Sequence, residues 1–276
     1  MSAGDALEIV PSGAALGAEV RGIDLTRPLP PGIQAALRQA WLEHLVLVFR
    51  DQPLDPEGFL VFARGFGRPV EYPFVTGIDG YPEIIEVKKL PHETVNFGGI
   101  WHTDTAYLEE PPMASTLLAR EVPPTGGDTL FANMYRAWET LPADTQRALA
   151  TRHAVNVSSK PAVSRTRQDR LAGREAPEHS AVHPVARTHP ETGRRSLYVN
   201  VAHTIRFTDL SEADSVPLLE SLFEHQVRDE FLFRLTWRPG TIALWDNRCT
   251  LHYPLNDYAG HRRVMHRITL AGDRPR

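Results

Sequence analysis

Short runs of β-branched and aromatic residues recur along nearly the whole chain, separated by proline, glycine and Asn-Asp pairs. Such side chains fit the pleated, half-buried surface of a sheet, and the separating residues favour turns, so each run predicts a strand. The predicted strands span residues 7–10, 45–49, 83–87, 115–119, 129–132, 196–199, 231–235, 241–245, 249–253 and 263–270.

Helical periodicity is confined to a few segments, one of which follows a predicted N-cap at Asp55. These segments span residues 33–44, 56–66, 137–152 and 211–228. The pattern contains many strands and few helices, without regular strand–helix alternation or a glycine-rich phosphate loop. It therefore favours a mainly β fold, a jelly roll or sandwich decorated by α-helices, over a doubly wound sheet.

Composition narrows the class of protein. The 276 residues suit one large domain or two small ones, and 30 basic against 34 acidic residues give a net charge of −4 without the basic stripe that nucleic-acid backbones require. Cys249 is the only cysteine, which excludes an intrachain disulfide and fits a reducing compartment. The most apolar short run, 45–49, is far too short to span a membrane. We therefore expect a cytoplasmic protein without nucleic-acid or membrane partners.

Residues 158–180 differ in composition from the rest of the chain. They are rich in Arg, Ser, Ala and Glu and lack apolar periodicity. We expect a mobile surface insertion there, and we favour a solvated loop over a lid that closes on a substrate.

Two places pair a histidine with an acid two residues later. Roughly 1.5 such pairs are expected by chance in a chain with 12 histidines and 34 acids, so the spacing alone is weak evidence. One of the pairs begins at His189, in Thr-His-Pro-Glu-Thr-Gly. This stretch is rich in turn formers, which predicts a plain surface turn with a structural role.

The other pair is His102 and Asp104, in Ile-Trp-His-Thr-Asp at 100–104. An extended backbone places residues i and i+2 on one face, so both side chains could reach one ion. The best candidate for a third ligand is His252, in the predicted strand 249–253. Two histidines and one carboxylate are the ligand set of non-haem iron oxygenases. The alternative is that both histidines are hydrogen-bonded residues of a sheet.

Two arginines share one face of the last predicted strand. Alternation places Arg263 and Arg267 together and turns Val264, His266 and Ile268 the other way. Guanidinium groups inside a barrel cost several kcal/mol each unless anions meet them, and arginine can bind a carboxylate through two hydrogen bonds. Inward-facing arginines would therefore predict two anionic ligands, whereas an exposed edge strand would leave both solvated.

In order and spacing, these motifs resemble the iron(II)- and 2-oxoglutarate-dependent dioxygenases of the taurine dioxygenase and 2,4-dichlorophenoxyacetate dioxygenase type. The resemblance covers nearly the whole chain. It is densest in Trp-His-Thr-Asp at 101–104, Thr-Gly-Gly-Asp-Thr at 125–129, Leu-Trp-Asp-Asn-Arg at 244–248, and His252 followed by Arg263 and Arg267. It implies a double-stranded β-helix formed by a single domain over residues 1–276, and a homo-oligomer.

The resemblance also implies the chemistry. His102, Asp104 and His252 are the expected ligands of Fe(II). The expected reaction consumes O2 and 2-oxoglutarate, hydroxylates a C–H bond of the substrate, and releases succinate and CO2.

Three further residues receive roles from the same resemblance. Arg263 is expected to pair with the distal carboxylate of 2-oxoglutarate, and Thr129 is expected to hydrogen-bond this co-substrate. Arg267 is expected to face the anionic group of the primary substrate.

The expected substrate pocket departs from the taurine-specific pattern. Tyr72, Val75 and Gly98 align where enzymes of the taurine type hold a sulfonate and an amine with His, Tyr and Asn side chains, so taurine is not the expected substrate. His203 matches a pocket-lining aromatic position, with an ordinary strand-end residue as the alternative. The expected substrate is a small organic anion, namely a sulfonate, a sulfate ester or a carboxylate such as an aryloxyalkanoate.

Several neighbouring residues have simpler interpretations. Asp246 and Asn247 fit a turn between strands, and Trp245 fits a packed sheet position. Phe97 and Tyr107 are interpreted as pocket wall or as core.

Two other functions would use the same residues. One is a jelly-roll hydrolase or isomerase with a redox-inert metal, which would need neither O2 nor 2-oxoglutarate. The other is a non-catalytic module that binds an organic anion. The complete ligand set, together with Arg263 and Thr129, favours the dioxygenase.

Overall fold

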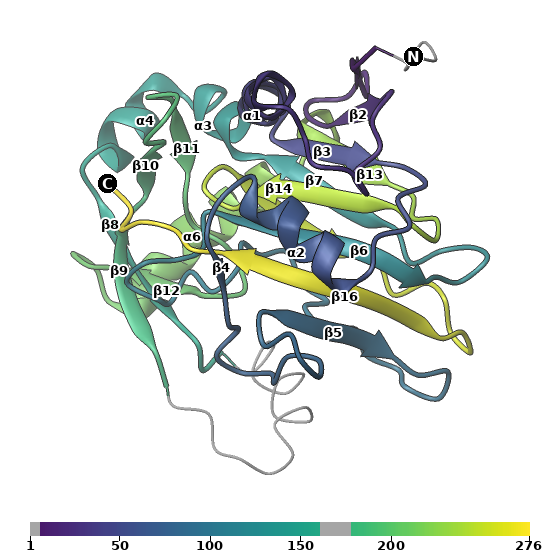
Figure 1. Cartoon of the computed structure of the whole chain (residues 1–276). Coiled ribbons are helices and arrows are strands. Elements are labelled where there is room, and N and C mark those ends of the chain that lie inside the picture. Colours follow the sequence, from purple (N-terminus) through teal and green to yellow (C-terminus); the bar gives the residue numbers. More distant parts are fainter. Residues whose placement is uncertain (1–5, 161–177) are drawn as a thin grey trace.

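Two β-sheets face each other in the protein, whose computed structural model describes residues 6–160 and 178–276 (Figure 1). The larger sheet has the order β1-β2-β3-β14-β6-β16-β4, and β5 also pairs with β16. Only the β2–β3 pairing is parallel among the described strands of this sheet. Its strands are β1 (Glu8–Pro11), β2 (Ala18–Arg21), β3 (Val46–Phe49), β4 (Pro69–Val70), β5 (Ile84–Lys89), β6 (Ala114–Glu121), β14 (Ile242–Asp246) and β16 (Arg263–Leu270).

The facing sheet has the order β13-β7-β15 and is antiparallel. Its strands are β7 (Thr129–Asn133), β13 (Leu232–Leu235) and β15 (Thr250–Pro254). Two smaller sheets lie to one side, on the left of Figure 1. They contain β12 (Thr204–Phe207), β8 (His153–Val157) and β9 (Ser180–Pro184), and the hairpin of β10 (Ala186–Thr188) and β11 (Arg195–Leu197).

Side-chain alternation along the strands separates an outer core from an inner one. In β14, Ile242 and Leu244 belong to the core outside the larger sheet, whereas Ala243 and Trp245 pack between the two sheets. The inner core also receives Phe131 from β7. Because alternate residues face opposite sides of a strand, the inward positions of β6, β7, β15 and β16 line the space between the sheets.

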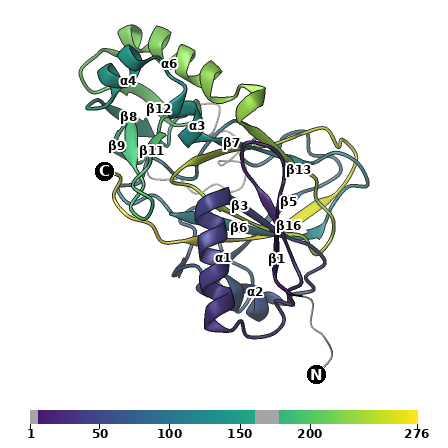
Figure 2. The ribbon, with the colours of Figure 1, turned by 90° about the horizontal axis from the view of Figure 1, so that it is seen from above.

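Two helices cover the outer face of the larger sheet (Figure 2). They are α1 (Pro31–His44) and α2 (Pro56–Arg64). Trp41 of α1 and Phe59 of α2 are fully buried in this outer core. The predicted cap of α2 is present, because the Asp55 side chain accepts a hydrogen bond from the Gly58 backbone N–H over 2.7 Å.

A third layer covers the side of the β13-β7-β15 sheet that faces away from the larger sheet. Its helices are α3 (Met134–Glu139), α4 (Ala143–Leu149), α6 (Glu212–Gln226) and the short 3-10 helix η1 (Asp229–Phe231). The single helix predicted over 137–152 is wrong, because the chain forms two helices with Pro142 between them. Proline removes a backbone donor and disfavours the helical conformation of the residue before it, so α3 ends and α4 begins at this point.

The fold class is confirmed as mainly β with decorating helices. A described strand overlaps each of the ten predicted runs, and β2, β4, β8, β9, β10 and β12 were not predicted. Most of the predicted insertion at 158–180 lies outside the described residues. At its base, the Ser158 N–H donates to the His179 carbonyl over 2.9 Å, next to the β8–β9 pairing. In the described ranges, no helix is long and apolar enough to cross a membrane.

Candidate active site

A backbone bridge brings the two halves of the predicted metal site together. The His102 N–H donates to the His252 carbonyl over 3.1 Å, and the His252 N–H donates to the His102 carbonyl over 2.8 Å. These bonds attach the loop around His102 to β15 as a short antiparallel pair. The two imidazole rings consequently lie 4.1 Å apart, centroid to centroid.

Asp104 completes the cluster. Its Oδ1 lies 3.7 Å from Nε2 of His102 and 3.8 Å from Nε2 of His252. Immediately after it, Thr105 adopts φ 42°, in the left-handed region that β-branched residues rarely enter. Such strain concentrates at functional sites. One donor atom from each of the three residues lies within 4.8 Å of the others, so the set could hold a metal ion.

The protonation states suit metal binding. Burial lowers the pKa of both His102 and His252, which favours neutral imidazoles with a free lone pair. Burial alone would raise the pKa of Asp104, but the nearby Arg267 and the two histidines outweigh it and hold the pKa below its usual range. The Ile100 carbonyl lies 2.7 Å from Nδ1 of His102. A proton on Nδ1 that bonds this carbonyl leaves Nε2 unprotonated, with its lone pair directed to the space beside Asp104.

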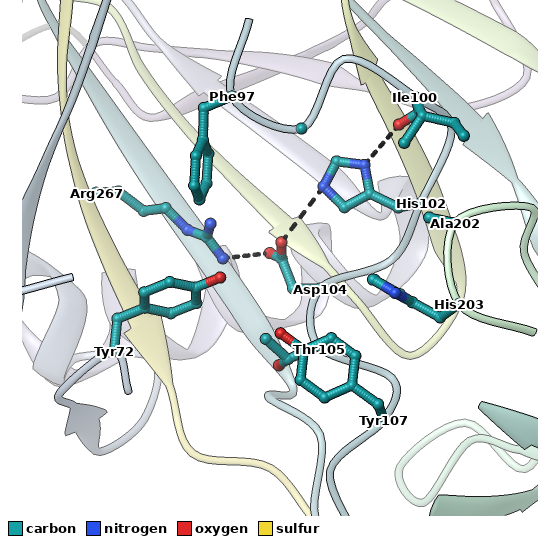
Figure 3. A pocket seen from close by; sticks show the side chains of 11 residues that line it. Tyr72, Phe97, Ile100, His102, Asp104, Thr105, Tyr107, Ala202, His203 and Arg267 are labelled. Carbon is teal, nitrogen blue, oxygen red and sulfur yellow. Dashed lines mark hydrogen bonds and ion pairs between the residues drawn. The ribbon is translucent and has the colours of Figure 1, made fainter. Parts of the chain in front are cut away.

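Both arginines predicted on one face of the last strand point inward from β16. Arg267 and Arg263 are 5% and 6% exposed. Nη2 of Arg267 donates to Oδ2 of Asp104 over 2.8 Å (Figure 3). His266, on the opposite face, instead accepts a hydrogen bond from Arg120. The predicted alternation is therefore confirmed.

The first of two adjoining pockets lies over Asp104 (Figure 3). Tyr72 and His203, predicted to contact substrate, both lie in its wall, and Val75 is not among the wall residues. Its lining is Tyr72, Phe97, Gly98, Ile100, His102, Asp104, Thr105, Tyr107, Ala202, His203 and Arg267. Most of these side chains are apolar or aromatic, and Arg267 is the one Lys or Arg side chain among the described residues that line it.

The second pocket shares Phe97, His102 and Arg267 with the first and continues towards Arg263 and Thr129. Nε and Nη2 of Arg263 are buried and find no hydrogen-bond partner among the described residues. No carboxylate in the described parts of the chain pairs with this guanidinium within 4.0 Å. Burial lowers the pKa of Arg263. Because a lone buried charge is costly, the arrangement favours an anionic ligand in this pocket.

Sequence reasoning missed two residues beside Asp104. Ser115 on β6 donates its hydroxyl to Oδ2 of Asp104 over 2.6 Å, and Nδ2 of Asn247 donates to Oγ of Ser115 over 3.1 Å. Asn247 had been interpreted only as a turn residue. The available signal was the position of Ser115, a polar residue in the same alternation as the inward-facing Leu117.

The surface turn predicted at His189 is wrong in one respect. The residue does lie between β10 and β11, but it is 1% exposed and its Nε2 lies 3.0 Å from Oδ2 of Asp246. The Asp246 carboxylate also receives bonds from Nε and Nη2 of Arg248, which hold its pKa below the usual range despite burial. His189, Asp246 and Cys249 could geometrically surround an ion. Since Arg248 already occupies both carboxylate oxygens, we interpret this cluster as structural.

A family model described as taurine catabolism dioxygenase TauD, TfdA family matches residues 8–269. The chain belongs to the TauD, TfdA family. This membership confirms the predicted enzyme class, a dioxygenase that uses Fe(II), 2-oxoglutarate and O2, and the predicted jelly roll.

Individual members of the TauD, TfdA family match this chain over most of their own length. An alpha-ketoglutarate-dependent sulfate ester dioxygenase from Pseudomonas putida is 34% identical, over 98% of this chain and 91% of that protein. An alkylsulfatase from Acinetobacter baylyi is 36% identical, over 94% of this chain and 83% of that protein. The crystal structure of a taurine dioxygenase from Burkholderia xenovorans matches with a TM-score of 0.84 and 35% identity, covering 98% of this chain and 92% of that one.

Proposed function

We propose that His102, Asp104 and His252 hold the Fe(II) of a 2-oxoglutarate-dependent dioxygenase that hydroxylates a small organic anion. The observation that carries the proposal is the convergence of these three donors at the junction of two anion-compatible pockets. The donor set fits iron, because two neutral imidazoles and one carboxylate leave coordination positions for other ligands. When bound, the iron activates O2 with electrons that come from the oxidative decarboxylation of 2-oxoglutarate.

Arg263 and Thr129 are the proposed contacts of 2-oxoglutarate. The two unpartnered donors of Arg263 suit a bidentate bond with its distal carboxylate. Thr129 faces the same pocket, and its hydroxyl oxygen already accepts the indole N–H of Trp237 over 3.0 Å. This bond leaves the Thr129 hydroxyl proton for the co-substrate.

Arg267, Tyr72 and His203 are the proposed substrate contacts. Arg267 supplies the positive charge, and its guanidinium lies 5.2 Å from the centre of the Tyr72 ring. His203 lies across the pocket, edge-on to Tyr107 at 4.9 Å. The apolar walls exclude water and suit a hydrocarbon or aryl body next to one anionic group.

Sulfate esters are the substrate class that we place first. Two of the relatives are named as acting on sulfate esters or as an alkylsulfatase. Hydroxylation of the carbon that bears a sulfate ester gives an unstable product, which breaks the C–O bond to sulfate and releases an aldehyde and hydrogen sulfate. Sulfonates and aryloxyalkanoates meet the same requirement for one anionic end and an apolar body.

The test is anaerobic reconstitution with Fe(II) and 2-oxoglutarate, followed by O2 and a panel of alkyl sulfates, alkanesulfonates and aryloxyalkanoates. Succinate formation above the substrate-free background is the expected result. The H252A variant should lose this activity, whereas H261A, which changes an exposed histidine outside both pockets, should retain it. Absence of substrate-dependent succinate across the whole panel would contradict the proposal.

The proposed enzyme acts as one domain over residues 1–276, as a homo-oligomer in the cytoplasm. The resemblance to the family and the single cysteine support these properties. Sedimentation velocity of the purified chain would measure its assembly, and a monomer would contradict that part.

A further inference from the structure

Four buried residues form a hydrogen-bonded chain that ends on Asp104. The chain runs from Trp245 through Asn247 and Ser115 to the carboxylate, and each of these residues is at most 3% exposed. Building on the proposed function, we propose that Ser115 and Asn247 are positioning residues, which orient Asp104 for metal binding without touching the metal.

The direction of each hydrogen bond between Trp245 and Asp104 follows from the Trp245 indole. The indole N–H of Trp245 can only donate, so the atom of Asn247 at 2.9 Å must be the carbonyl oxygen Oδ1. The amide nitrogen of Asn247 therefore faces Ser115 and donates to its hydroxyl oxygen. The Ser115 proton is then directed to Oδ2 of Asp104.

These bonds leave the two carboxylate oxygens in different environments. Oδ2 accepts from Ser115 at 2.6 Å and from Arg267 at 2.8 Å, whereas Oδ1 faces His102 and His252. The Ser115 hydroxyl is also saturated, with one proton donated and two bonds accepted, from Asn247 and, at 3.3 Å, from Arg267. Rotation of the carboxylate would break the bonds to Oδ2, so Oδ1 stays directed at the proposed metal position.

The backbone of Asn247 also bonds the segment that carries His102 and Asp104. Its carbonyl accepts the Thr103 hydroxyl over 2.7 Å, and its N–H donates to the Met113 carbonyl over 2.9 Å. The β14–β15 turn thus contacts both the residue between the two proposed ligands and the residue before β6. These contacts explain how Asn247 reaches Ser115 across 132 positions of sequence.

Arg267 alone is a poor support for Asp104. In the proposed function this guanidinium also receives the anionic group of the substrate, so its bond to Asp104 changes whenever substrate binds. Ser115 and Asn247 line neither of the two pockets, so the bonds from Asn247 to Ser115 and from Ser115 to Asp104 do not compete with substrate. They supply the constant part of the restraint.

The experiment measures Mn(II) binding to the metal-free protein by calorimetry, without turnover. We expect S115A to weaken Mn(II) binding tenfold to a hundredfold, the usual effect of removing a partner of a metal ligand. T116V is the matched control, because Thr116 is the buried neighbour on β6 and its hydroxyl bonds no other group in residues 6–160 and 178–276. It should change Mn(II) affinity less than twofold. Urea unfolding of each metal-free variant separates a loss of folding from a loss of positioning.

N247A is the second variant, and it should act in the same direction as S115A. Because Asn247 side-chain contacts reach Asp104 through Ser115, the double variant should lose little more affinity than S115A alone. Equal Mn(II) affinities of wild type, S115A and N247A would overturn the inference while leaving the proposed function intact. A wild-type protein that binds no Mn(II) would overturn both.

Discussion

Arg267 donates to Asp104 over 2.8 Å, so the proposed substrate-binding cation is ion-paired with a proposed metal ligand. Both side chains are nearly inaccessible to solvent. In such a buried pair, each charge depends on the other for compensation. The metal position and the substrate position are therefore electrostatically coupled before any ligand arrives.

Replacing Arg267 by Met tests this pair. Of the two groups that donate to the Asp104 carboxylate among the described side chains, R267M would leave only Ser115 to a buried charge, so the free energy of unfolding of the metal-free protein should fall by about 3 kcal/mol. Urea unfolding measures this change, and the KM for the anionic substrate should rise in parallel. R262M, which removes the half-exposed partner of Glu121, is the control and should cost less than about 1 kcal/mol. A stability equal to that of wild type would argue that the pair contributes nothing net.

Replacing Arg263 by Met should have two opposite effects. Removal of a buried guanidinium that pairs with no carboxylate in the described parts of the chain should raise the free energy of unfolding in the absence of 2-oxoglutarate by about 1 kcal/mol. The affinity for 2-oxoglutarate should fall at least about thirtyfold, since a buried charge pair with its distal carboxylate is lost. Calorimetry and thermal unfolding with and without 2-oxoglutarate measure both effects. An unchanged 2-oxoglutarate affinity would refute the assigned role, and R262M should bind like wild type.

Gly98 lies against the His102 ring and leaves no room for a side chain, so we expect G98A to disturb the metal site. Its φ is +70°, and a Cβ there would lie 2.9 Å from Cε1 of His102. The His102 ring is held at Nδ1 by Ile100, so its displacement should weaken Mn(II) binding measurably. Gly260 has φ +80°, and a Cβ there would meet no atom of the described residues within 4 Å, so G260A carries only the backbone cost of about 1 kcal/mol. The two variants should differ in Mn(II) affinity, and equal affinities would show that the contact is harmless.

Stability should depend on pH through His183. Burial lowers its pKa to about 4, against about 6.5 in the unfolded chain. The unfolded state therefore binds more protons between these values, and stability is lost as the pH falls from about 6.5 to about 4. The maximum contribution is about 3 kcal/mol. Urea unfolding from pH 4.5 to 7 should give a shallower slope for H183Q than for wild type, whereas H153Q, at an exposed position, should follow wild type. Parallel curves for H183Q and wild type would rule out this contribution.

Local rules accounted for much of the fold. Period-two alternation correctly placed Arg263 and Arg267 on one face of β16, and Asp55 caps α2 as predicted. The helix predicted over 137–152 is interrupted because Pro142 lacks a backbone N–H and disfavours a helical conformation in the residue before it. The predicted helix ended at residue 152, directly before β8, and the alternating pattern His-Ala-Val-Asn-Val of β8 was not among the predicted strands.

Local sequence patterns predicted less of the site than of the fold. The i, i+2 spacing of His102 and Asp104 indicated half of it, but their meeting with His252 depends on backbone pairing between distant segments. The strand pattern indicated His252 as the best candidate for the third ligand, and the family resemblance then implied it. Alternation places Ser115 on the inward face of β6, but its role depends on Asn247 approaching it in the folded chain.

The antiparallel bridge between His102 and His252 is made of main-chain atoms, so it is indifferent to most side-chain replacements around it. It does depend on the number of residues in the paired segments. A residue inserted or deleted within the bridged stretch would shift the alternation by one place and turn Trp101 and Thr103 towards the cavity. Homologous chains can therefore diverge in composition at this stretch, while gaps in their alignment should fall outside it.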